Sequence, residues 1–288
     1  MIPVSSFLIP ALESESPAFP DHQPARFEMK IIDLHTHPIF MGKGSRKKEV
    51  EQACAECRAL GIVRMNALGD VSVFGNCPDA GQLVRINNSS GRLQKMHPDF
   101  FTSFCYLNPT LGERAVMKEI ERCVSKFGSK GIKLEKANNA SADCMKNIAR
   151  AAREYELPVL QHTWSVFGVA GRRISRRIQS DPIDTAHFAR RFPEVKVIMA
   201  HLTGFGFRGI AEVKHLPNLS IDTSAGFPEE GLIEYAVEQL GADRVYYGSD
   251  FPIREQSVTI GRILGARIKE TDRRKILHDN AARLLGTN

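Results

Sequence analysis

The sequence predicts an α/β protein folded as a single (β/α)8 barrel of the TIM type. Its 288 residues fall in the size range of that fold, which begins at roughly 200 to 250 residues. Short β-branched runs alternate with amphipathic helical stretches, as expected for βα units around a parallel sheet. Eight strand candidates, each followed by a helical pattern, favour a barrel over a doubly wound sheet.

The strand candidates are short apolar segments rich in β-branched residues, and glycine, proline or polar residues bound most of them. They are Ile31 to His35, Ile62 to Ala67, Phe101 to Leu107, Gly131 to Glu135, Pro158 to His162, Val195 to His201, Leu219 to Thr223 and Arg244 to Ser249. In a barrel their carboxyl ends meet at one mouth, where the active sites of this fold lie.

The helical stretches carry apolar residues at spacings of three and four. Those between strands are Lys47 to Leu60, Gly81 to Met96, Arg114 to Phe127, Ala142 to Tyr155, Ile183 to Phe192, Phe207 to Leu216 and Glu229 to Leu240. Glu255 to Ile268 and Asp272 to Leu285 follow the last strand. The longest insertion, Ser165 to Ser180, follows the fifth strand and would overhang the mouth of the barrel.

Residues 1–28 are rich in proline and show no periodicity, so we expect a flexible N-terminal extension followed by one barrel domain over residues 29–288. Met29 directly precedes the first strand and is a candidate for the true start. No apolar run approaches the roughly 18 residues that cross a bilayer. The N-terminus lacks the charged and then apolar order of a secretory signal. These features predict a protein that is neither exported nor embedded in a membrane.

The composition, 42% hydrophobic and 25% charged residues, excludes the disordered, collagen-like and coiled-coil classes. The net charge of +6 and the pI near 9.0 suit an anionic substrate or a weak attraction to nucleic acid. The basic run Arg172, Arg173, Arg176 and Arg177 has little aromatic interleaving. It is therefore more typical of a solvated face than of a nucleic-acid interface.

The six cysteines are scattered in a chain too long to depend on disulfide bonds, which favours a reducing, cytoplasmic compartment. Cys54 and Cys57 form a CxxC pair within an amphipathic helical stretch. The sequence lacks the second pair that would complete a zinc site. Burial of one helix face therefore explains their spacing better.

The sharpest local signal is the segment IIDLHTHP, in which His35 and His37 lie two positions apart at the end of the first strand. Alternation along a strand places both imidazoles on one face, where they could bind one ion. The same alternation places Asp33 deeper on that face, either orienting an imidazole or closing the barrel bottom with a salt bridge. Taken alone, the two histidines are equally compatible with ordinary hydrogen-bonded residues.

The other chemically capable residues also fall at strand ends. Lys133 and Glu135 end the fourth strand, His162 the fifth and His201 the sixth, and Asp250 follows the eighth. Each has an ordinary structural explanation: an ion pair for Lys133 and Glu135, a satisfied core histidine for His162 or His201, and helix capping for Asp250. Their joint placement at one mouth is much harder to explain without a functional site.

These motifs resemble the amidohydrolase superfamily, most closely the amidohydrolase-related (amidohydrolase 2) family of hydrolases and aminocarboxymuconate-semialdehyde-type decarboxylases. The resemblance spans about Lys30 to Leu285. Its carriers, in order along the chain, are IIDLHTHP, GIKLE, LPVLQHT, VIMAHLTG, RVYYGSDFP and HDNAARLLG. The combination of an HxH pair with a late aspartate is the specific feature.

The resemblance implies that His35, His37 and Asp250 bind a divalent metal, with His162 as a further ligand. It makes His201 either a ligand of a second ion or a general acid and base. In two-metal relatives, a carboxylated lysine or a glutamate at the end of the fourth strand bridges the ions, a role that either Lys133 or Glu135 could fill. Zinc is the metal we expect, as one ion or two.

Three functions follow as hypotheses. The first is a metal-dependent hydrolase of a small amide, ester or lactone, in which Asp250 accepts the proton of an attacking water. The second is a nonoxidative decarboxylase of a small carboxylic acid, a carbon-carbon lyase, in which His201 handles the proton. The third, which the dispersed ligands disfavour, is a noncatalytic metal-binding or nucleic-acid-binding module.

Substrate recognition is expected from residues on loops that face the mouth. The candidates are Trp164, Arg172, Arg173, Phe205 and Arg208. Trp164 is predicted as a pocket wall, and an arginine could bind a carboxylate through its guanidinium fork, although each arginine alone is more typical of a surface. We expect a small, anionic substrate. A homo-oligomer is compatible with the sequence.

Overall fold

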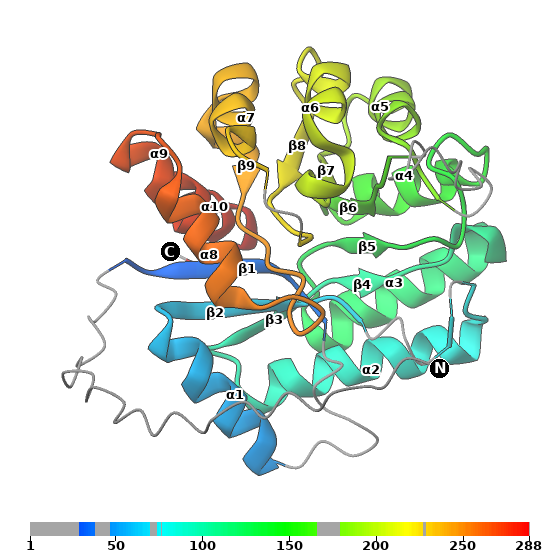
Figure 1. Ribbon diagram of the computed structural model, residues 1–288. Coiled ribbons are helices and arrows are strands. Elements are labelled where there is room, and N and C mark those ends of the chain that lie inside the picture. Colours follow the sequence, from blue (N-terminus) through cyan, green and yellow to red (C-terminus); the bar gives the residue numbers. More distant parts are fainter. Residues whose placement is uncertain are drawn as a thin grey trace, which may run out of the picture.

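Parallel strands alternate with helices along the chain and build the barrel that the sequence predicts (Figure 1). The computed structural model describes residues 29–37, 47–69, 74–75, 77–165, 179–226 and 229–287. The strands are β1 (Ile31–Thr36), β2 (Ile62–Ala67), β3 (Phe101–Ser103), β4 (Cys105–Tyr106), β5 (Ile132–Leu134), β6 (Val159–His162), β7 (Val197–Ala200), β8 (Leu219–Asp222) and β9 (Val245–Tyr246).

The barrel closes across two seams between the ladders β1-β2-β3 and β4 to β9. At the first, Phe104 interrupts the predicted third strand: its amide donates to the carbonyl of Ala67 (3.2 Å), whereas the amide of Cys105 donates to Gly131 (2.8 Å). At the second, the amide of Leu34 donates to the carbonyl of Tyr247 (3.0 Å). With β3 and β4 taken as one interrupted strand, the described residues supply the eight strand positions of the predicted barrel.

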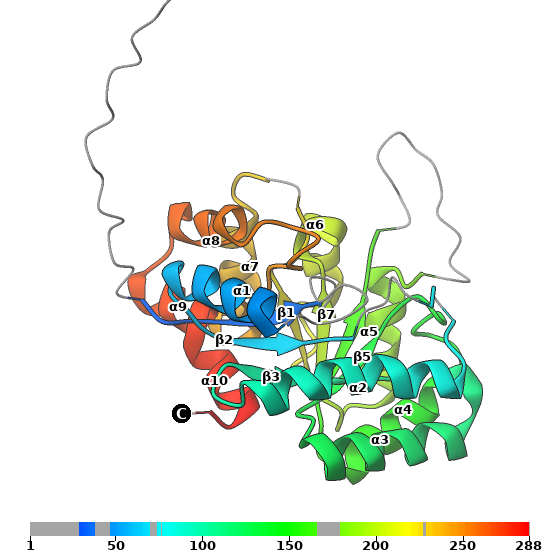
Figure 2. The same cartoon turned by 90° about the horizontal axis from the view of Figure 1, so that it is seen from below.

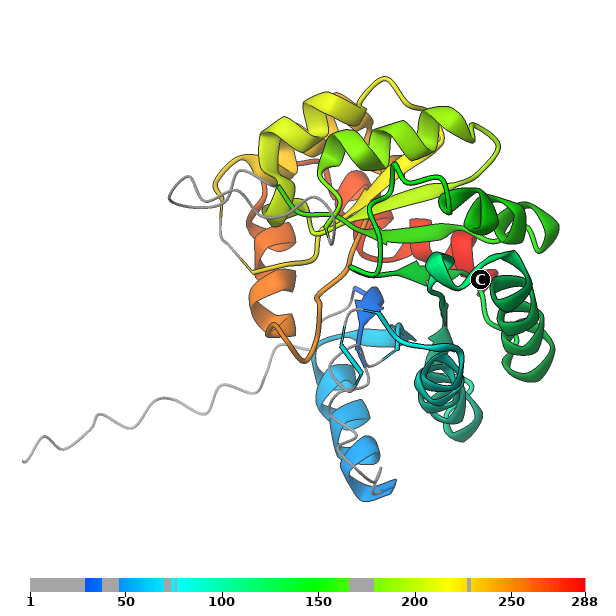
Figure 3. The same cartoon turned by 90° about the vertical axis from the view of Figure 1, so that its right-hand side faces the viewer.

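Helices surround the strands (Figures 2 and 3). They are α1 (Lys47–Ala59), α2 (Ala80–Met96), α3 (Glu113–Phe127), α4 (Met145–Glu154), α5 (Pro182–Arg191), α6 (Leu202–Val213), α7 (Leu232–Leu240), α8 (Gln256–Gly265), α9 (Glu270–Arg274) and α10 (Asn280–Leu285). Short 3-10 turns occupy Pro109–Leu111 and Ala242–Arg244, and a π turn at Lys275–Asp279 joins α9 to α10.

Local sequence signals explain several helix ends. A capping box between Asp79 and Gln82 starts α2. Asp181 caps α5 ahead of Pro182, which suits the first helical position because its missing N–H is not needed there. Gly128, in the left-handed conformation (φ 66°), ends α3.

The expected start of the sixth helix at Phe207 agrees with the second helical piece of α6, whereas the first piece, which begins at Leu202 directly after β7, was not expected. The backbone at Gly206 is non-helical (φ 60°, ψ −160°), so two helical pieces meet at a kink there. Gly204 lies in the first piece, where an added Cβ would stand 2.5 Å from the Trp164 ring. Gly204 and Gly206 therefore permit a close approach and a kink within this helical segment.

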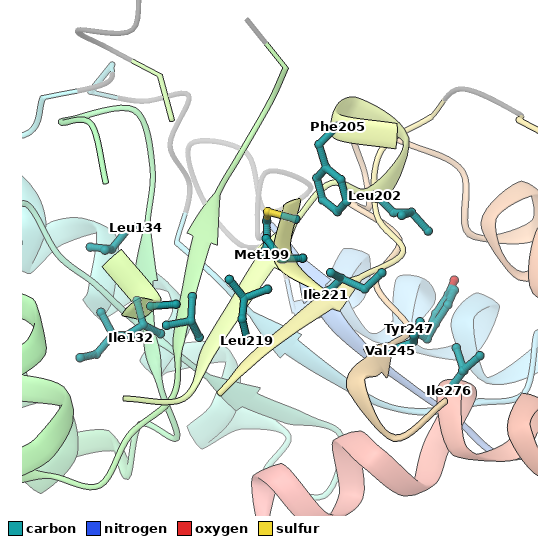
Figure 4. Packing of buried hydrophobic residues seen from close by; sticks show 14 of the residues in the cluster. Ile132, Leu134, Met199, Leu202, Phe205, Leu219, Ile221, Val245, Tyr247 and Ile276 are labelled. Carbon is teal, nitrogen blue, oxygen red and sulfur yellow. The ribbon is translucent and has the colours of Figure 1, made fainter. Parts of the chain in front are cut away.

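Two apolar layers hold the barrel together. The outer layer lies between strands and helices and includes Ile221 of β8 and Met199 of β7 (Figure 4). Cys54 and Cys57 belong to it and are 2% exposed, as expected from their helical spacing. Full burial of an isoleucine or methionine side chain, such as Ile221 or Met199, stabilises the fold by about 1.5 to 3 kcal/mol.

The inner layer fills the barrel and is continuous with α10. Ile32, Leu160 and Ile198 point inward and pack with Ala281 and Leu285 of that helix. Because these inward residues precede the site residues on their own strands, α10 closes the amino-terminal end of the barrel. The opposite end is left for the site. No helix among the described ranges is long and apolar enough to cross a membrane.

Candidate metal-binding active site

The side chains predicted at the strand ends converge at the carboxyl end of the barrel, and all are buried. They are His35, His37, Lys133, Glu135, His162, His201 and Asp250. They come from β1, β5, β6 and the segments that directly follow β7 and β9. The barrel thus brings together residues as far apart in the sequence as His35 and Asp250, which are separated by 215 positions.

The two histidines of the HxH segment point the same ring nitrogen at Asp250. His35 Nδ1 bonds Asp222 Oδ2 (2.7 Å), and His37 Nδ1 bonds the carbonyl of Gly69 (2.9 Å). These partners leave both Nε2 atoms facing Asp250 Oδ1, at 3.6 Å from His35 and 3.4 Å from His37. Ligands about 2.1 Å from a tetrahedral ion lie roughly 3.4 Å apart, so one cation can contact Asp250 Oδ1 and either imidazole. His35, His201 and Asp250 offer three ligand atoms that all lie within 4.8 Å of one another.

A register shift in β1 between Asp33 and Thr36 places His35 in the barrel. Leu34 already points inward with the inner layer, so strict alternation would turn His35 outward. The absence of a side chain at Gly248 makes the space, since an added Cβ there would stand 2.7 Å from His35 Cβ.

The expectation that Asp33 shares the face of the two histidines is wrong. Its carboxylate accepts bonds from Ser249 Oγ (2.5 Å), the Ser249 amide (3.0 Å) and Gln256 Nε2 (3.0 Å) of α8. Burial raises the pKa of Asp33 to about 6. The register shift separates Asp33 from the barrel interior. The Asp33 carboxylate therefore connects β1 to the segment that carries Asp250, and it neither orients an imidazole nor closes the barrel bottom.

Lys133 and Glu135 form an ion pair of 2.9 Å, with the lysine fully buried. Lys133 Nζ also lies 3.4 Å from His35 Nε2. Although burial alone would raise it, the ammonium of Lys133 and the neighbouring His162 hold the pKa of Glu135 well below its usual range. This contact is the ion pair that one of the two sequence-based alternatives describes, and a bridging role for either residue stays a prediction.

His162 and His201 continue this chain of contacts. Glu135 Oε2 lies 3.2 Å from His162 Nδ1, and His162 Nδ1 lies 2.9 Å from His201 Nε2. His162 Nε2 is buried and has no hydrogen-bond partner in the part of the chain that the structure describes. A buried, unpartnered imidazole nitrogen is what a metal ligand presents before its ion is bound.

Asp222 and Ser224 are site residues that the sequence analysis missed. Ser224 Oγ contacts Asp222 Oδ1 (2.5 Å), His201 Nδ1 (3.0 Å) and His35 Nδ1 (3.2 Å). Asp222 Oδ1 also accepts from the His201 amide (3.0 Å). The available signal was a carboxylate one position before the end of the seventh predicted strand, close to the kind of position that identified His162.

Burial favours the neutral form of three of the four site histidines. Desolvation lowers the pKa of His35 and of His201 well below the usual value, and it also lowers the pKa of His162. For His37, burial is opposed by the hydrogen bond to Asp250, and the pKa is raised. Neutral imidazoles with one free nitrogen are the form that binds a divalent metal.

A cavity of about 350 Å³ opens directly above these groups. Its lining comprises His37, Glu135, Lys136, His162, Trp164, Gln179, His201, Asp250, Ile253 and Arg254. Trp164 stands in the wall as predicted, with its ring 5.8 Å from that of His201. Gln179 Nε2 is buried without a hydrogen-bond partner among the described residues.

The other residues expected to bind substrate lie elsewhere. Phe205 is 3% exposed and packs in the outer layer (Figure 4), so its expected place on a loop facing the site is wrong. Arg208 pairs with Asp181 and bonds Ser165 Oγ (3.3 Å), and the cavity lining does not include it. Arg172 and Arg173 fall outside the described residues.

A second group of potential ligands, Cys105, Glu119 and Cys123, lies between β4 and α3. Glu119 Oε1 already accepts bonds from Arg122 (2.6 Å) and Asn87 (2.7 Å). Burial raises the pKa of the Cys105 thiol well above its usual value. A protonated thiol at Cys105 and a carboxylate bound to a guanidinium are poor cation ligands, so this group serves packing.

Comparison with known proteins identifies the family of this chain and relates its fold to solved structures. Residues 32–287 match the protein-family model described as Amidohydrolase. The 2,6-dihydroxybenzoate decarboxylase from Rhizobium is 17% identical, with a TM-score of 0.70 over 90% of this chain and 99% of that one. The 5-carboxyvanillate decarboxylase from Sphingomonas paucimobilis is 15% identical, with a TM-score of 0.68 over 90% and 99%.

A third structure, the dihydroxybenzoic acid decarboxylase from Polaromonas sp. JS666, holds manganese and the inhibitor 2-nitroresorcinol. It is 17% identical, with a TM-score of 0.67 over 90% of this chain and 97% of that one. At such identities these structures establish the shared barrel fold, which extends over nearly the whole of each chain.

Proposed function

This chain belongs to the amidohydrolase family, and from that membership we propose that it is a metal-dependent decarboxylase of a small aromatic carboxylic acid. The observation that carries the proposal is the cavity. Metal-ligand atoms form its floor, an indole forms part of its wall, and Lys136 and Arg254 add positive charge to its lining. A flat, anionic substrate matches that combination.

We assign one divalent cation to the floor, bound by His35, His37, His162 and Asp250. The converging Nε2 atoms and the unpartnered His162 Nε2 support this set. The Lys133 ammonium, 3.4 Å from His35 Nε2, makes a second cation beside it unfavourable. When bound, the ion would act as a Lewis acid on the substrate oxygens. Manganese joins the expected zinc as a candidate, because a similar structure holds it.

Because the two similar structures are decarboxylases of aromatic acids, we prefer decarboxylation over the hydrolysis expected first. In this reaction the bond between the ring carbon and the carboxylate carbon breaks, carbon dioxide leaves, and the electron pair left on the ring carbon takes up a proton. One proton is consumed for each carboxylate lost. The ring keeps all its other atoms.

His201 is our candidate for delivering that proton. Its ring lines the cavity, and Ser224 holds its Nδ1 at 3.0 Å. Burial disfavours the charged imidazole, so a proton taken up at Nε2 would be given readily to carbon. Lys136, Arg254 and the side-chain amide of Gln179 would hold the anionic substrate against the floor.

The test is to incubate the metal-loaded protein with hydroxylated benzoic acids and, separately, with lactones, esters and amides. In deuterated water we expect carbon dioxide and one deuterium on the ring carbon that carried the carboxylate. His201→Asn should lower turnover strongly while metal content is kept. Incorporation of oxygen-18 from water into a product, with no carbon dioxide, would establish the hydrolase instead.

Asp250→Asn separates the two mechanisms further. If Asp250 is a metal ligand in a decarboxylase, the Asp250→Asn variant should lose bound metal and turnover together. In a hydrolase it would also accept the proton of the attacking water, so turnover would fall even after excess metal restored occupancy.

A further inference from the structure

Arg262 lies on α8, outside the barrel, and its side chain forms hydrogen bonds with the loop that follows β8. Its Nη2 atom donates to the carbonyl of Thr223 (2.9 Å) and to the carbonyl of Ala225 (2.9 Å). These two carbonyls flank Ser224 on either side. One guanidinium nitrogen thus holds both ends of the tripeptide whose central hydroxyl lies in the site.

Ser224 is the point where the loop meets the site. Its hydroxyl stands 3.0 Å from His201 Nδ1 and 2.5 Å from Asp222 Oδ1, and the residue is fully buried. A hydroxyl has one proton, and the short contact indicates that it is donated to the carboxylate. Ser224 Oγ is then an acceptor for His201 Nδ1–H, which leaves Nε2 of His201 as the basic nitrogen of the neutral ring.

The loop needs holding because one side of it is in an unfavourable conformation. Ala225 has φ 75°, in the left-handed region that costs a residue with a Cβ about 1 to 2 kcal/mol. The Thr223 side is anchored to the β9 segment, because Thr223 Oγ1 donates to the carbonyl of Gly248 (3.2 Å). On the Ala225 side, the hydrogen bond from Arg262 Nη2 to the carbonyl of Ala225 fixes the loop.

The two hydrogen bonds from Arg262 require partial burial of a charged guanidinium, which costs desolvation free energy. Burial lowers the pKa of Arg262, and the negative charges of Asp222 and Glu229 act against that effect. A half-buried guanidinium bonded to two carbonyls is an expensive way to fill space next to a helix.

We propose that Arg262 is a positioning residue, which fixes Ser224 and through it the tautomer and orientation of His201. The inference rests on the proposed function only in that His201 handles the proton. It requires that removal of the guanidinium changes the His201 ring, while His35, which Ser224 also contacts at 3.2 Å, is kept in place by its shorter bond to Asp222 (2.7 Å).

A cavity of about 410 Å³ beside Arg262 makes a direct test feasible. Arg262 itself lines it, together with Gly261, Gly265 and Leu202. Free guanidinium can therefore reach the space that Arg262→Ala vacates. Arg267→Ala is the matched control, since that side chain is 79% exposed and its nearest carboxylate is Glu230 at 4.0 Å.

In Arg262→Ala we expect kcat to fall by at least about tenfold, KM and metal affinity to stay within about threefold, and added guanidinium to restore most of kcat. Arg267→Ala should behave as the unaltered protein and ignore guanidinium. A purely structural role would lower the melting temperature without guanidinium rescue of kcat in the folded, metal-loaded molecules. That result would overturn the proposal.

A second readout needs no substrate. Nitrogen-15 spectra of the histidine rings report the tautomer of His201, which Arg262→Ala should change and guanidinium should restore. Unchanged ring spectra would overturn the proposal. If the unaltered protein decarboxylates none of the acids, the proposed function fails while these spectra still decide the role of Arg262. Should Arg262→Ala fail to fold, Arg262→Lys, which keeps the charge but not the fork, is judged by the same spectra.

Discussion

Single residues in this site act through one ring nitrogen at a time. His35 and His37 each give Nδ1 to a fixed acceptor and aim Nε2 at Asp250. The acceptors decide which nitrogen is left for a metal, so the chemistry of the floor depends as much on Asp222 and the carbonyl of Gly69 as on the imidazoles.

Replacing His35 or His37 by asparagine should remove most bound metal and leave the barrel folded, because strand-end ligands add little to core packing. Elemental analysis and circular dichroism measure the two effects together. His187→Asn, at an exposed position on α5, is the control and should keep its metal. Full metal content in the His35, His37 double variant would disprove the ligand assignment.

Asp222→Asn should weaken metal binding by about 10- to 100-fold, the usual effect of removing the partner of a metal-binding histidine. The amide keeps one acceptor oxygen, but its NH2 group must meet either His35 Nδ1–H or the amide of His201. Competition with a chelator measures the affinity. A change smaller than about twofold would mean that Asp222 does not orient His35.

At the scale of elements, β1 and the segment after β9 approach each other closely enough to exclude a methyl group. Gly248→Ala would place Cβ 2.7 Å from His35 Cβ and 3.5 Å from Asp222 Cβ, both fixed by their strands. We expect a loss of about 1 to 3 kcal/mol in the free energy of unfolding and weaker metal binding. Denaturant unfolding and metal titration measure these effects.

Gly261→Ala on α8 is the matched control, because nothing lies within 4 Å of its added Cβ. It should stabilise the protein by up to about 1 kcal/mol through helix propensity. If Gly248→Ala were equally harmless, the close approach of the two elements would not constrain the site.

The same elements mark how far sequence reasoning reaches. Alternation and strand ends predict the barrel and the convergence of His162, His201 and Asp250, because the parallel order of strands fixes which ends meet. The pattern misses the register shift in β1, so Asp33 was placed on the wrong face. It also misses Ser224, whose role depends on a loop conformation and a grip from α8 that no local signal encodes.

At the scale of the whole molecule, α10 already closes the end of the barrel opposite the site. We therefore predict that a variant beginning at Met29 keeps the melting temperature and metal affinity of the full chain. Thermal unfolding with and without metal checks both. A drop of about 4 °C or more, roughly 1 to 2 kcal/mol for a protein of this size, would instead assign residues 1–28 a stabilising role.

The seam between the first strand and the last segment has a consequence for biosynthesis. The backbone carbonyl of His35 accepts a hydrogen bond from the amide of Asp250, and the amide of His37 donates to the carbonyl of Phe251. A growing chain therefore holds its first two ligands for the entire time needed to make the other strands, and the site closes only after Asp250 has left the ribosome. With the proposed ligand set, we expect metal binding to be a late event in the life of the chain, because it depends on the slow long-range closure of the barrel.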